Sequence, residues 1–273
     1  MAKVLILGYV SPNDIDTVSK LNISVIAYDT ELLEKYLEST DRVLHVHVNR
    51  NTGMSRLSTK KKLYKFKHPR VYTEGLMTHF SNTGDLVYSD RQAEEFDSIK
   101  SDIVYRHAQA TDAVFMYDMN VSHIRPGIGL YKDCMTVTSV VENIATYPKG
   151  TQIGYSAGYT TRRSERIAVI GIGYGSGYGR HYKGHPFVII NGVICFVIGN
   201  VCMNQLYVSV PFSADIAIGD AVVVLDNEKI TTTMMASWFN TIEYEIFIRF
   251  GNSNIHTVYE NTHKEFINPL FRK

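Results

Sequence analysis

The stretch KVLILGYVSPND (residues 3–14) contains the pattern on which the fold prediction rests. An apolar run of strand length, Lys3 to Tyr9, is followed at once by a helix start. In that start Ser11 supplies a capping hydroxyl, Pro12 takes the first helical position and Asp14 brings a carboxylate three residues after the cap. The stretch therefore predicts a β-strand that leads directly into an α-helix.

The same alternation continues along the first 131 residues. Further helices are predicted from Asp29 to Ser39 and from Ser89 to Lys100. Strands that alternate with helices predict a parallel sheet covered by helices, although periodicity does not distinguish a barrel from an open sheet. The strand candidates are Lys3 to Tyr9, Ile23 to Asp29, Val43 to Asn49, Tyr72 to Phe80, Ile103 to Ala108 and His123 to Tyr131.

After residue 131 the chain changes to short alternating strands separated by turn signals, which is typical of a mainly β domain. Its strongest local signal is FVIINGVICFVI (residues 187–198), in which Asn191 and Gly192 supply the two positive-φ residues of a type I′ hairpin turn. Thr231 to Asn240 is predicted to be a helix, and Tyr244 to Phe250 is compatible with a helix or a strand. We therefore expect two domains, at residues 1–131 and 132–273.

The composition is that of an ordinary globular protein, with 45% apolar and 20% charged residues. The formal net charge of +1 gives no field that would attract nucleic acid or an anionic membrane. The longest apolar stretch, Phe187 to Cys202, is interrupted by polar residues and is too short to span a bilayer. The cysteines Cys134, Cys195 and Cys202 lack metal-ligand spacing and are expected to be small core residues. We therefore expect a cytoplasmic protein without a metal, a nucleic-acid partner or a membrane partner.

Two conspicuous patterns are better explained by ordinary structure than by a ligand site. The glycine-rich run Gly171 to Gly179 has neither the G-x-G-x-x-G spacing nor a Walker lysine, so nucleotide binding is not expected. The basic run Lys60 to Arg70 could contact phosphate groups. Without a wider basic surface, a solvated helix face is the simpler interpretation.

Three short segments have the character of ligand sites. In Arg125 to Tyr131 the glycines expose N–H groups that could cradle a phosphate, or they simply allow two strands to approach closely. Asn51 to Leu57 ends another strand with a glycine turn and directs Arg56 toward the C-terminal mouth, where α/β barrels keep their chemistry. His79, at the end of a third strand, could be a ligand, a base or a structural histidine. These residues alone leave the ligand unidentified.

Seven segments occur in a recognisable order: Asn51 to Leu57, Gly75 to Phe80, Arg125 to Tyr131, Tyr159-Thr160, Ile172 to Tyr174, Val201 to Gln205 and Thr241 to Glu245. In this order they resemble alanine racemases, from the third barrel strand nearly to the C-terminus. The resemblance implies an α/β plus β fold, in which a (β/α)8 TIM-type barrel bearing pyridoxal 5'-phosphate precedes a C-terminal mainly β domain. Because only about six strand candidates are present, the barrel expected here is incomplete.

The resemblance also implies a mechanism. Racemisation needs a base on each face of the α-carbon and a cofactor that stabilises the carbanion. Tyr159 matches the tyrosine base, which the family supplies from the partner subunit. Arg125 matches the arginine that faces the pyridine nitrogen. The N–H groups of Gly127 and Ile128 and the hydroxyl of Tyr244 would bind the phosphate.

The remaining matches concern the cofactor ring, the substrate and the assembly. His79 would hold the ring, and Arg56 would reach the phenolic oxygen and the substrate carboxylate. Met203 would offer backbone to that carboxylate, and Tyr174 would line the entry. Because the family's site is shared across a two-fold interface, the resemblance implies a homodimer that acts on alanine.

Several positions depart from the family pattern. No segment resembles the strand that carries the Schiff-base lysine, so we expect an N-terminally truncated protein that forms no aldimine by itself. Gln109 and Ala110 stand at cofactor-binding positions that are asparagine and serine in the family, which removes one hydroxyl donor. Asn204 replaces an aspartate, and Asn49 replaces a lysine but can still brace Arg56.

Three functional alternatives remain open. The first is an alanine racemase whose lysine-bearing start has been lost or misassigned. The second is a non-catalytic relative, which the changes at Gln109, Ala110 and Asn204 favour. The third is a partner chain that docks on a full-length racemase and lends Tyr159 to its site.

Overall fold

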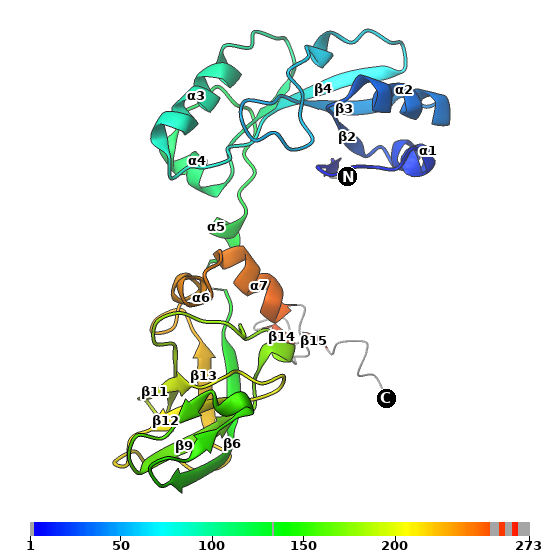
Figure 1. Cartoon of the computed structure of the whole chain (residues 1–273). Coiled ribbons are helices and arrows are strands. Elements are labelled where there is room, and N and C mark those ends of the chain that lie inside the picture. Colours follow the sequence, from blue (N-terminus) through cyan, green and yellow to red (C-terminus); the bar gives the residue numbers. More distant parts are fainter. Residues whose placement is uncertain (1–2, 133, 252–256, 260–263, 267–273) are drawn as a thin grey trace. The chain divides into compact units, whose positions relative to one another are not determined.

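The computed structural model describes residues 3–132, 134–251, 257–259 and 264–266. The chain divides into two compact units, Met1–Leu130 and Tyr131–Lys273 (Figure 1). We call the first the barrel unit and the second the β unit.

The barrel unit contains a parallel sheet of five strands that neighbour one another in chain order. Helices follow the strands, as the alternation in the sequence predicted, and the prediction of an incomplete (β/α) barrel is confirmed. The strands are β1 (Leu5–Ile6), β2 (Ser24–Ala27), β3 (Leu44–Asn49), β4 (Val71–Met77) and β5 (Tyr105–His107). The helices are α1 (Ile15–Lys20), α2 (Thr30–Ser39), α3 (Leu86–Asp97), α4 (Thr111–Met116) and α5 (Ile128–Tyr131), with short turns η1 (Pro12–Asp14) and η2 (Leu63–Lys65).

The prediction of a sixth strand at residues 123–131 is wrong, because this segment gives its backbone hydrogen bonds to other partners. The N–H groups of Ser122 and His123 both donate to the single carbonyl of Arg106, at 2.8 and 3.1 Å. Pro126 has no N–H to donate, and the chain then turns into α5. The segment therefore contacts β5 without forming a ladder.

Side-chain caps fix three of the helix starts of the barrel unit, those of η1, α2 and α3. Ser11 accepts a hydrogen bond from the N–H of Asn13 at 3.2 Å, and Asp29 accepts one from the N–H of Leu32 at 2.9 Å. The third helix begins three residues earlier than predicted, because Asp85 caps it.

The sheet of the barrel unit has one apolar face and one polar face, which decides where a site can form. On β3, Val46 and Val48 are buried in the core that the helices cover, together with Phe96 of α3. His45 and His47 alternate with these valines along the strand, so they face the opposite side. The polar face is therefore available for chemistry.

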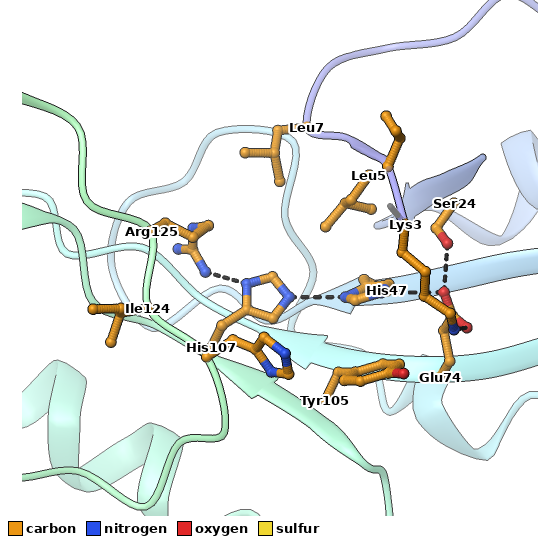
Figure 2. Close-up of a pocket in the computed structure, with 12 residues that line it drawn as sticks. Lys3, Leu5, Leu7, Ser24, His47, Glu74, Tyr105, His107, Ile124 and Arg125 are labelled. Carbon is orange, nitrogen blue, oxygen red and sulfur yellow. Dashed lines mark hydrogen bonds and ion pairs between the residues drawn. The ribbon is translucent and has the colours of Figure 1, made fainter. Parts of the chain in front are cut away.

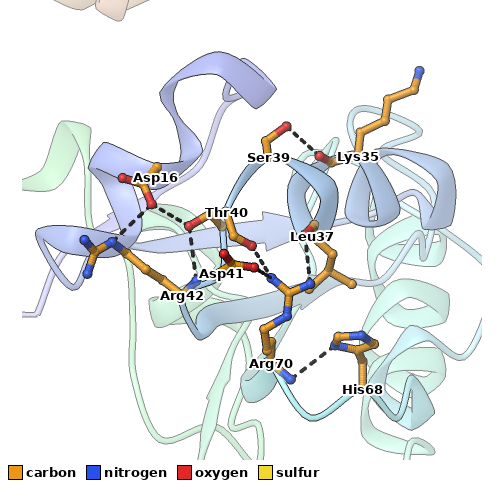
Figure 3. Close-up of polar contacts among 9 residues, drawn as sticks. All are labelled: Asp16, Lys35, Leu37, Ser39, Thr40, Asp41, Arg42, His68 and Arg70. Atoms are coloured by element: carbon orange, nitrogen blue, oxygen red, sulfur yellow. Dashed lines mark hydrogen bonds and ion pairs between the residues drawn. The ribbon is translucent and has the colours of Figure 1, made fainter.

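Polar contacts tie the ends of α1 and α2 to the segments that enter β3 and β4 (Figure 3). Asp16 accepts hydrogen bonds from Thr40 Oγ1 at 2.6 Å and from Arg42 Nε at 3.1 Å. The guanidinium of Arg70 donates to the carbonyl groups of Thr40 and Leu37 at the C-terminal end of α2. These contacts fix the amino ends of the strands and leave the carboxyl ends free for a site.

The β unit is a closed barrel of six strands in the order β10-β11-β12-β9-β6-β13, which confirms the predicted mainly β domain. The hairpin at residues 187–198 is also confirmed, with positive φ at Asn191 (49°) and Gly192 (79°). The barrel strands are β6 (Val137–Tyr147), β9 (Glu165–Ile170), β10 (Phe187–Ile190), β11 (Val193–Ile198), β12 (Leu206–Val210) and β13 (Ala221–Leu225). The other elements are β7 (Gln152–Ile153), β8 (Tyr159–Thr160), β14 (Thr257–Tyr259), β15 (Lys264–Phe266), α6 (Thr232–Phe239), α7 (Glu243–Gly251), η3 (Tyr155–Ala157) and η4 (Tyr174–Ser176).

The β unit contains two helices, and each lies in a segment for which the sequence made a prediction. The helix predicted at residues 231–240 is confirmed as α6, whose cap Thr231 accepts a hydrogen bond from the N–H of Met234 at 3.3 Å. The ambiguous segment at residues 244–250 is helical and belongs to α7. Among the residues that the structure describes, no helix has the length and apolar character needed to cross a bilayer.

Two expectations from composition are corrected. The basic run Lys60–Arg70 is not a helix face, because only the short turn η2 is helical there and the guanidinium of Arg50 binds carbonyl groups at its start. Cys195 and Cys202 are buried as expected. Cys134 is exposed, because it lies in the segment between α5 and β6 and not in a strand.

Candidate active site

A cavity of about 490 Å³ lies along the polar face of the barrel unit, and Arg125 is one of its lining residues (Figure 2). Its Nη2 donates to the carbonyl of Thr78 at 2.5 Å and to that of Ala108 at 3.2 Å, and its Nη1 donates to Nδ1 of His107. Burial lowers the pKa of Arg125 to about 10, so the guanidinium stays charged at neutral pH. The carboxyl ends of β4 and β5 thus hold a fixed cation at the cavity.

A row of polar side chains continues from Arg125 across the sheet (Figure 2). Nε2 of His107 lies 2.8 Å from Nδ1 of His47, and Nε2 of His47 lies 3.4 Å from Oε1 of Glu74. The other carboxylate oxygen of Glu74 accepts a hydrogen bond from Lys3 Nζ at 2.8 Å. The row therefore joins β5, β3 and β4 and reaches the segment that enters β1.

Burial and neighbouring charges fix the protonation states in this row. Burial alone would raise the pKa of Glu74, but hydrogen bonds, first that from Lys3, outweigh it and lower the pKa to about 2. Burial, followed by the charge of Arg125, lowers the pKa of His107 to about 3. Burial also lowers the pKa of His47. At neutral pH the row therefore contains one carboxylate and two neutral imidazoles.

The residues of this row other than Arg125 were not predicted from the sequence. One signal was present, because His45 and His47 occupy alternate positions of an otherwise apolar strand. Polar residues at such positions indicate a strand face turned away from the core. Periodicity alone does not show that His107 and Glu74 lie beside that face.

The predicted residues His79 and Arg56 belong to the carboxyl end of the sheet. Nδ1 of His79 lies 3.4 Å from Nη2 of Arg125. Burial, then the charges of Arg125 and Arg56, lower the pKa of His79 to about 4, so its imidazole is neutral at neutral pH. Arg56 is exposed, and the side-chain amide of Asn49 donates to the carbonyl of Leu57 at 2.8 Å. Asn49 therefore braces the backbone of this loop rather than the Arg56 guanidinium.

The predicted phosphate segment is organised by Thr111, which was not predicted from the sequence. Its Oγ1 accepts hydrogen bonds from the N–H groups of Gly127 at 3.0 Å and Gly129 at 3.1 Å. A Cβ at Gly129 would lie 2.8 Å from Cγ2 of Thr111, so only glycine fits this approach. Ile128 lies between the two glycines and begins α5. The first turn of α4 and the start of α5 are thereby joined through one hydroxyl.

The two predicted residues that precede Thr111 contribute differently. The side-chain amide of Gln109 is buried and donates to the carbonyl groups of Ala113 at 2.9 Å and Tyr117 at 2.6 Å. Ala110 is the residue before α4 and has no polar side-chain atom. In this structure Gln109 therefore stabilises the end of α4.

In the β unit, the predicted substrate residues Met203 and Tyr174 line one cavity of about 610 Å³. The N–H of Gly175 donates to the Met203 carbonyl at 2.7 Å, and the N–H of Tyr174 donates to the Cys202 carbonyl at 3.0 Å. Gly173 permits this approach, because a Cβ there would overlap the carbonyl oxygen of Cys202. The glycine-rich run thus packs two backbone segments together, in agreement with its expected structural role.

Tyr159, the predicted base, donates its hydroxyl proton to Oε2 of Glu165 at 2.6 Å. The other oxygen of Glu165 accepts a hydrogen bond from the N–H of Arg162 at 2.7 Å. Burial, followed by the hydrogen bond to Glu165, raises the pKa of Tyr159, so the phenol is protonated at neutral pH. Tyr244, predicted to bind phosphate, is exposed on α7.

The predicted residues are thus distributed over both units. Arg125 and His79 are brought within hydrogen-bonding distance in the barrel unit. Met203 and Tyr174 share a cavity in the β unit. In the described part of the chain, no cluster of three or more histidine, cysteine, aspartate or glutamate side chains is arranged to hold a metal ion.

Comparisons with known proteins cover both units. The family model "Alanine racemase, N-terminal domain" matches residues 1–134, and "Alanine racemase, C-terminal domain" matches residues 134–259. Alanine racemase of Thermodesulfovibrio yellowstonii is 30% identical over 264 residues, which cover 87% of this chain and 72% of the relative. That of Staphylococcus carnosus is 30% identical, over 94% of this chain and 76% of the relative. The crystal structure of alanine racemase from E. faecalis matches with 26% identity and a TM-score of 0.81, over 91% of this chain and 76% of that one.

Proposed function

The chain belongs to the alanine racemase family, and from this premise we propose that it binds pyridoxal 5'-phosphate and takes part in interconverting L-alanine and D-alanine. The covalent anchor would be a lysine outside residues 1–273, since none of the lysines in this chain matches the family's position. The observation that carries the proposal is the half-buried Arg125 guanidinium, fixed at the carboxyl ends of β4 and β5.

The donor set of the barrel unit fits the cofactor. Arg125 is a permanent cation whose Nε has no partner among the described residues, and the imidazoles of His107 and His79 beside it are neutral at neutral pH. A fixed cation facing a ring nitrogen favours the unprotonated ring. For the phosphate, Gly127, Ile128 and Tyr244 are the proposed ligands. The N–H of Gly127 would have to exchange Thr111 Oγ1 for the phosphate, and the hydroxyl of Thr111 would supply the donor that Ala110 lacks.

Racemisation then divides among residues of both units. Pyridoxal phosphate, when bound, stabilises the negative charge that develops at the α-carbon. Tyr159 would hold and return a proton at its phenolic oxygen on one face, and the external lysine would serve the other face. Arg56 and the Met203 backbone would bind the substrate carboxylate, and Tyr174 would line the approach. His79 would hold the ring.

The oligomeric state is inferred from the distribution of these roles over the two units. We propose a homodimer in which Tyr159 of one subunit serves the cofactor of the other, as in the family. The exposed side chains of Met203 and Tyr174, which line one cavity of the β unit, support an intermolecular role for that cavity. A cytoplasmic location and alanine, rather than serine, as the substrate are part of the same proposal.

A second candidate function is that of a non-catalytic relative. Its support is the side chain of Gln109, which is occupied by the end of α4, and the missing hydroxyl at Ala110. Such a protein would hold the cofactor weakly. It could still lend Tyr159 to a complete racemase.

The test is a racemisation assay with L-alanine and pyridoxal phosphate. The purified chain is assayed alone and mixed with a lysine-bearing barrel segment from a relative. We expect D-alanine only in the mixture, and we expect the Tyr159→Phe variant to form less of it. If the mixture is inactive although pyridoxal phosphate binds, the proposal fails and the non-catalytic relative is favoured.

A further inference from the structure

Four side chains form a continuous row of polar contacts, which we call the relay: Glu74, His47, His107 and Arg125 (Figure 2). Its contacts join Glu74 Oε1 to His47 Nε2 at 3.4 Å, His47 Nδ1 to His107 Nε2 at 2.8 Å, and His107 Nδ1 to Arg125 Nη1. Arg125 is the member that faces the cofactor in the proposed function. Glu74 is three contacts away from it and has no role there.

The two ends of the relay determine the direction of each hydrogen bond. A guanidinium only donates, so Nδ1 of His107 is an acceptor and the ring proton lies on Nε2. That Nε2–H donates to Nδ1 of His47, which places the proton of His47 on its own Nε2. This second Nε2 lies 3.4 Å from the carboxylate of Glu74, which only accepts. One arrangement of protons therefore satisfies all three contacts.

The arrangement requires neutral rings. A protonated imidazole at either position would turn two N–H donors toward each other or toward the Arg125 guanidinium. Burial keeps both His47 and His107 neutral at neutral pH, as their lowered pKa values show. Each ring is therefore free to accept with one nitrogen and donate with the other.

The backbone of β4 places Glu74 where it completes the relay. The pairing of β3 with β4 steps from Val46 and Thr73 to His47 and Gly75, so Glu74 is the extra residue at this shift. Its side chain is 2% exposed and receives further hydrogen bonds from neighbouring side chains, which are those of Lys3, Ser24 and His45. A buried carboxylate with this many donors is held in one position.

Gly75 provides the space that the relay needs. A Cβ at this position would overlap Nδ1 of His47, the atom that accepts from His107. A substitution at Gly75 would therefore displace the His47 ring without removing any charged group. The space at Gly75 and the charge of Glu74 are independent features, and each of them is needed for the contacts of the relay.

We propose that Glu74 is a positioning residue for Arg125: through His47 and His107 its carboxylate fixes both imidazole tautomers, and so holds the Arg125 guanidinium in one orientation toward the cavity. The proposal rests on the proposed function only in naming pyridoxal phosphate as the ligand that Arg125 meets. The tautomers themselves are a property of the unliganded chain.

The first experiment reads the tautomers by ¹⁵N NMR of the full chain labelled at histidine, with His47 and His107 assigned by substitution. We expect both rings to carry the proton on Nε2. In Glu74→Gln the side-chain amide can accept or donate, and in Gly75→Ala the ring is displaced, so both variants should show a mixture of tautomers at His47. Proton signals on Nδ1 in the unaltered chain, or unchanged spectra in both variants, would overturn the proposal.

The second experiment measures pyridoxal phosphate binding by equilibrium dialysis. We expect Glu74→Gln and Gly75→Ala to bind about tenfold more weakly, because a hydrogen-bonded charged group loses its fixed orientation. The controls are Glu95→Gln, which removes an ion pair outside the relay, and Gly8→Ala, whose added Cβ meets nothing within 4 Å. Circular dichroism checks that each variant is folded.

The outcomes separate the two claims. If the unaltered chain does not bind pyridoxal phosphate, the proposed function fails, while the tautomers still decide whether the relay exists. If the chain binds and both folded variants bind equally well, Glu74 does not position Arg125 and the proposed function stands.

Discussion

Lowering the pH from about 7.5 to about 5 is expected to destabilise the barrel unit, because His47, His79 and His107 are held there as neutral rings. The pKa of His79 is lowered to about 4 and that of His107 to about 3, from an ordinary value of 6.5. At pH values between the folded and the ordinary pKa, these histidines are protonated in the unfolded chain and neutral in the folded chain. The contribution of these histidines to the free energy of unfolding is therefore fully present above the ordinary pKa of 6.5. It is lost as the pH falls toward the pKa values of the folded chain.

The loss of stability is set by how far the pH lies below the ordinary histidine pKa. At a pH of about 5, His79 and His107 each lower the free energy of unfolding by about 2 kcal/mol, or about 4 kcal/mol together, and His47 acts in the same direction. Glu74 does not oppose this change, because a carboxyl whose pKa is lowered to about 2 keeps its stabilising effect until the pH falls below about 4.5. The histidines therefore dominate in this window.

The assay is hydrogen exchange of peptides from β3, β4 and β5, measured by mass spectrometry at both pH values and corrected for the intrinsic exchange rate. The His79→Gln variant should lose about 2 kcal/mol of the pH dependence. His181→Gln, which changes an exposed histidine of the β unit, should retain all of it. Equal protection of β3 to β5 at both pH values would refute the reasoning.

Three further substitutions test packing and local structure. Leu76→Ala should lower the free energy of unfolding by about 2–5 kcal/mol in urea titrations, because this side chain is fully buried. Asp29→Ala should cost about 1 kcal/mol in the same titrations, since it removes the cap of α2. Gly173→Ala should lower the melting temperature in calorimetry and Gly8→Ala should not, because only at Gly173 would the added Cβ overlap a neighbouring carbonyl.

Local patterns in the sequence were sufficient for most of the fold. The caps at Ser11 and Asp29, the alternation of strands with helices and the Asn191–Gly192 turn each depend on neighbouring residues only. The segment after β5 was mistaken for a strand because its apolar residues resemble one. Its N–H groups at Ser122 and His123 both donate to the carbonyl of Arg106, and no local sequence pattern predicts this pairing.

The candidate site was predicted only in part, for a related reason. Arg125 and His79 could be named from motifs, and the structure brings them within 3.4 Å. Glu74 and His107 could not, because their contacts with His47 depend on which strands pair and on the register shift in β4. Register is a property of the folded sheet and is not visible in one strand.

The central claim is that the barrel unit binds pyridoxal phosphate at Arg125 without a covalent anchor in residues 1–273. The most direct measurement is equilibrium dialysis of the purified chain with pyridoxal phosphate, followed by borohydride reduction and mass spectrometry. We predict one bound cofactor per chain that Arg125→Met releases, and no reduced adduct on a lysine. Absence of binding, or a stoichiometric adduct on a lysine such as Lys3, would contradict the claim.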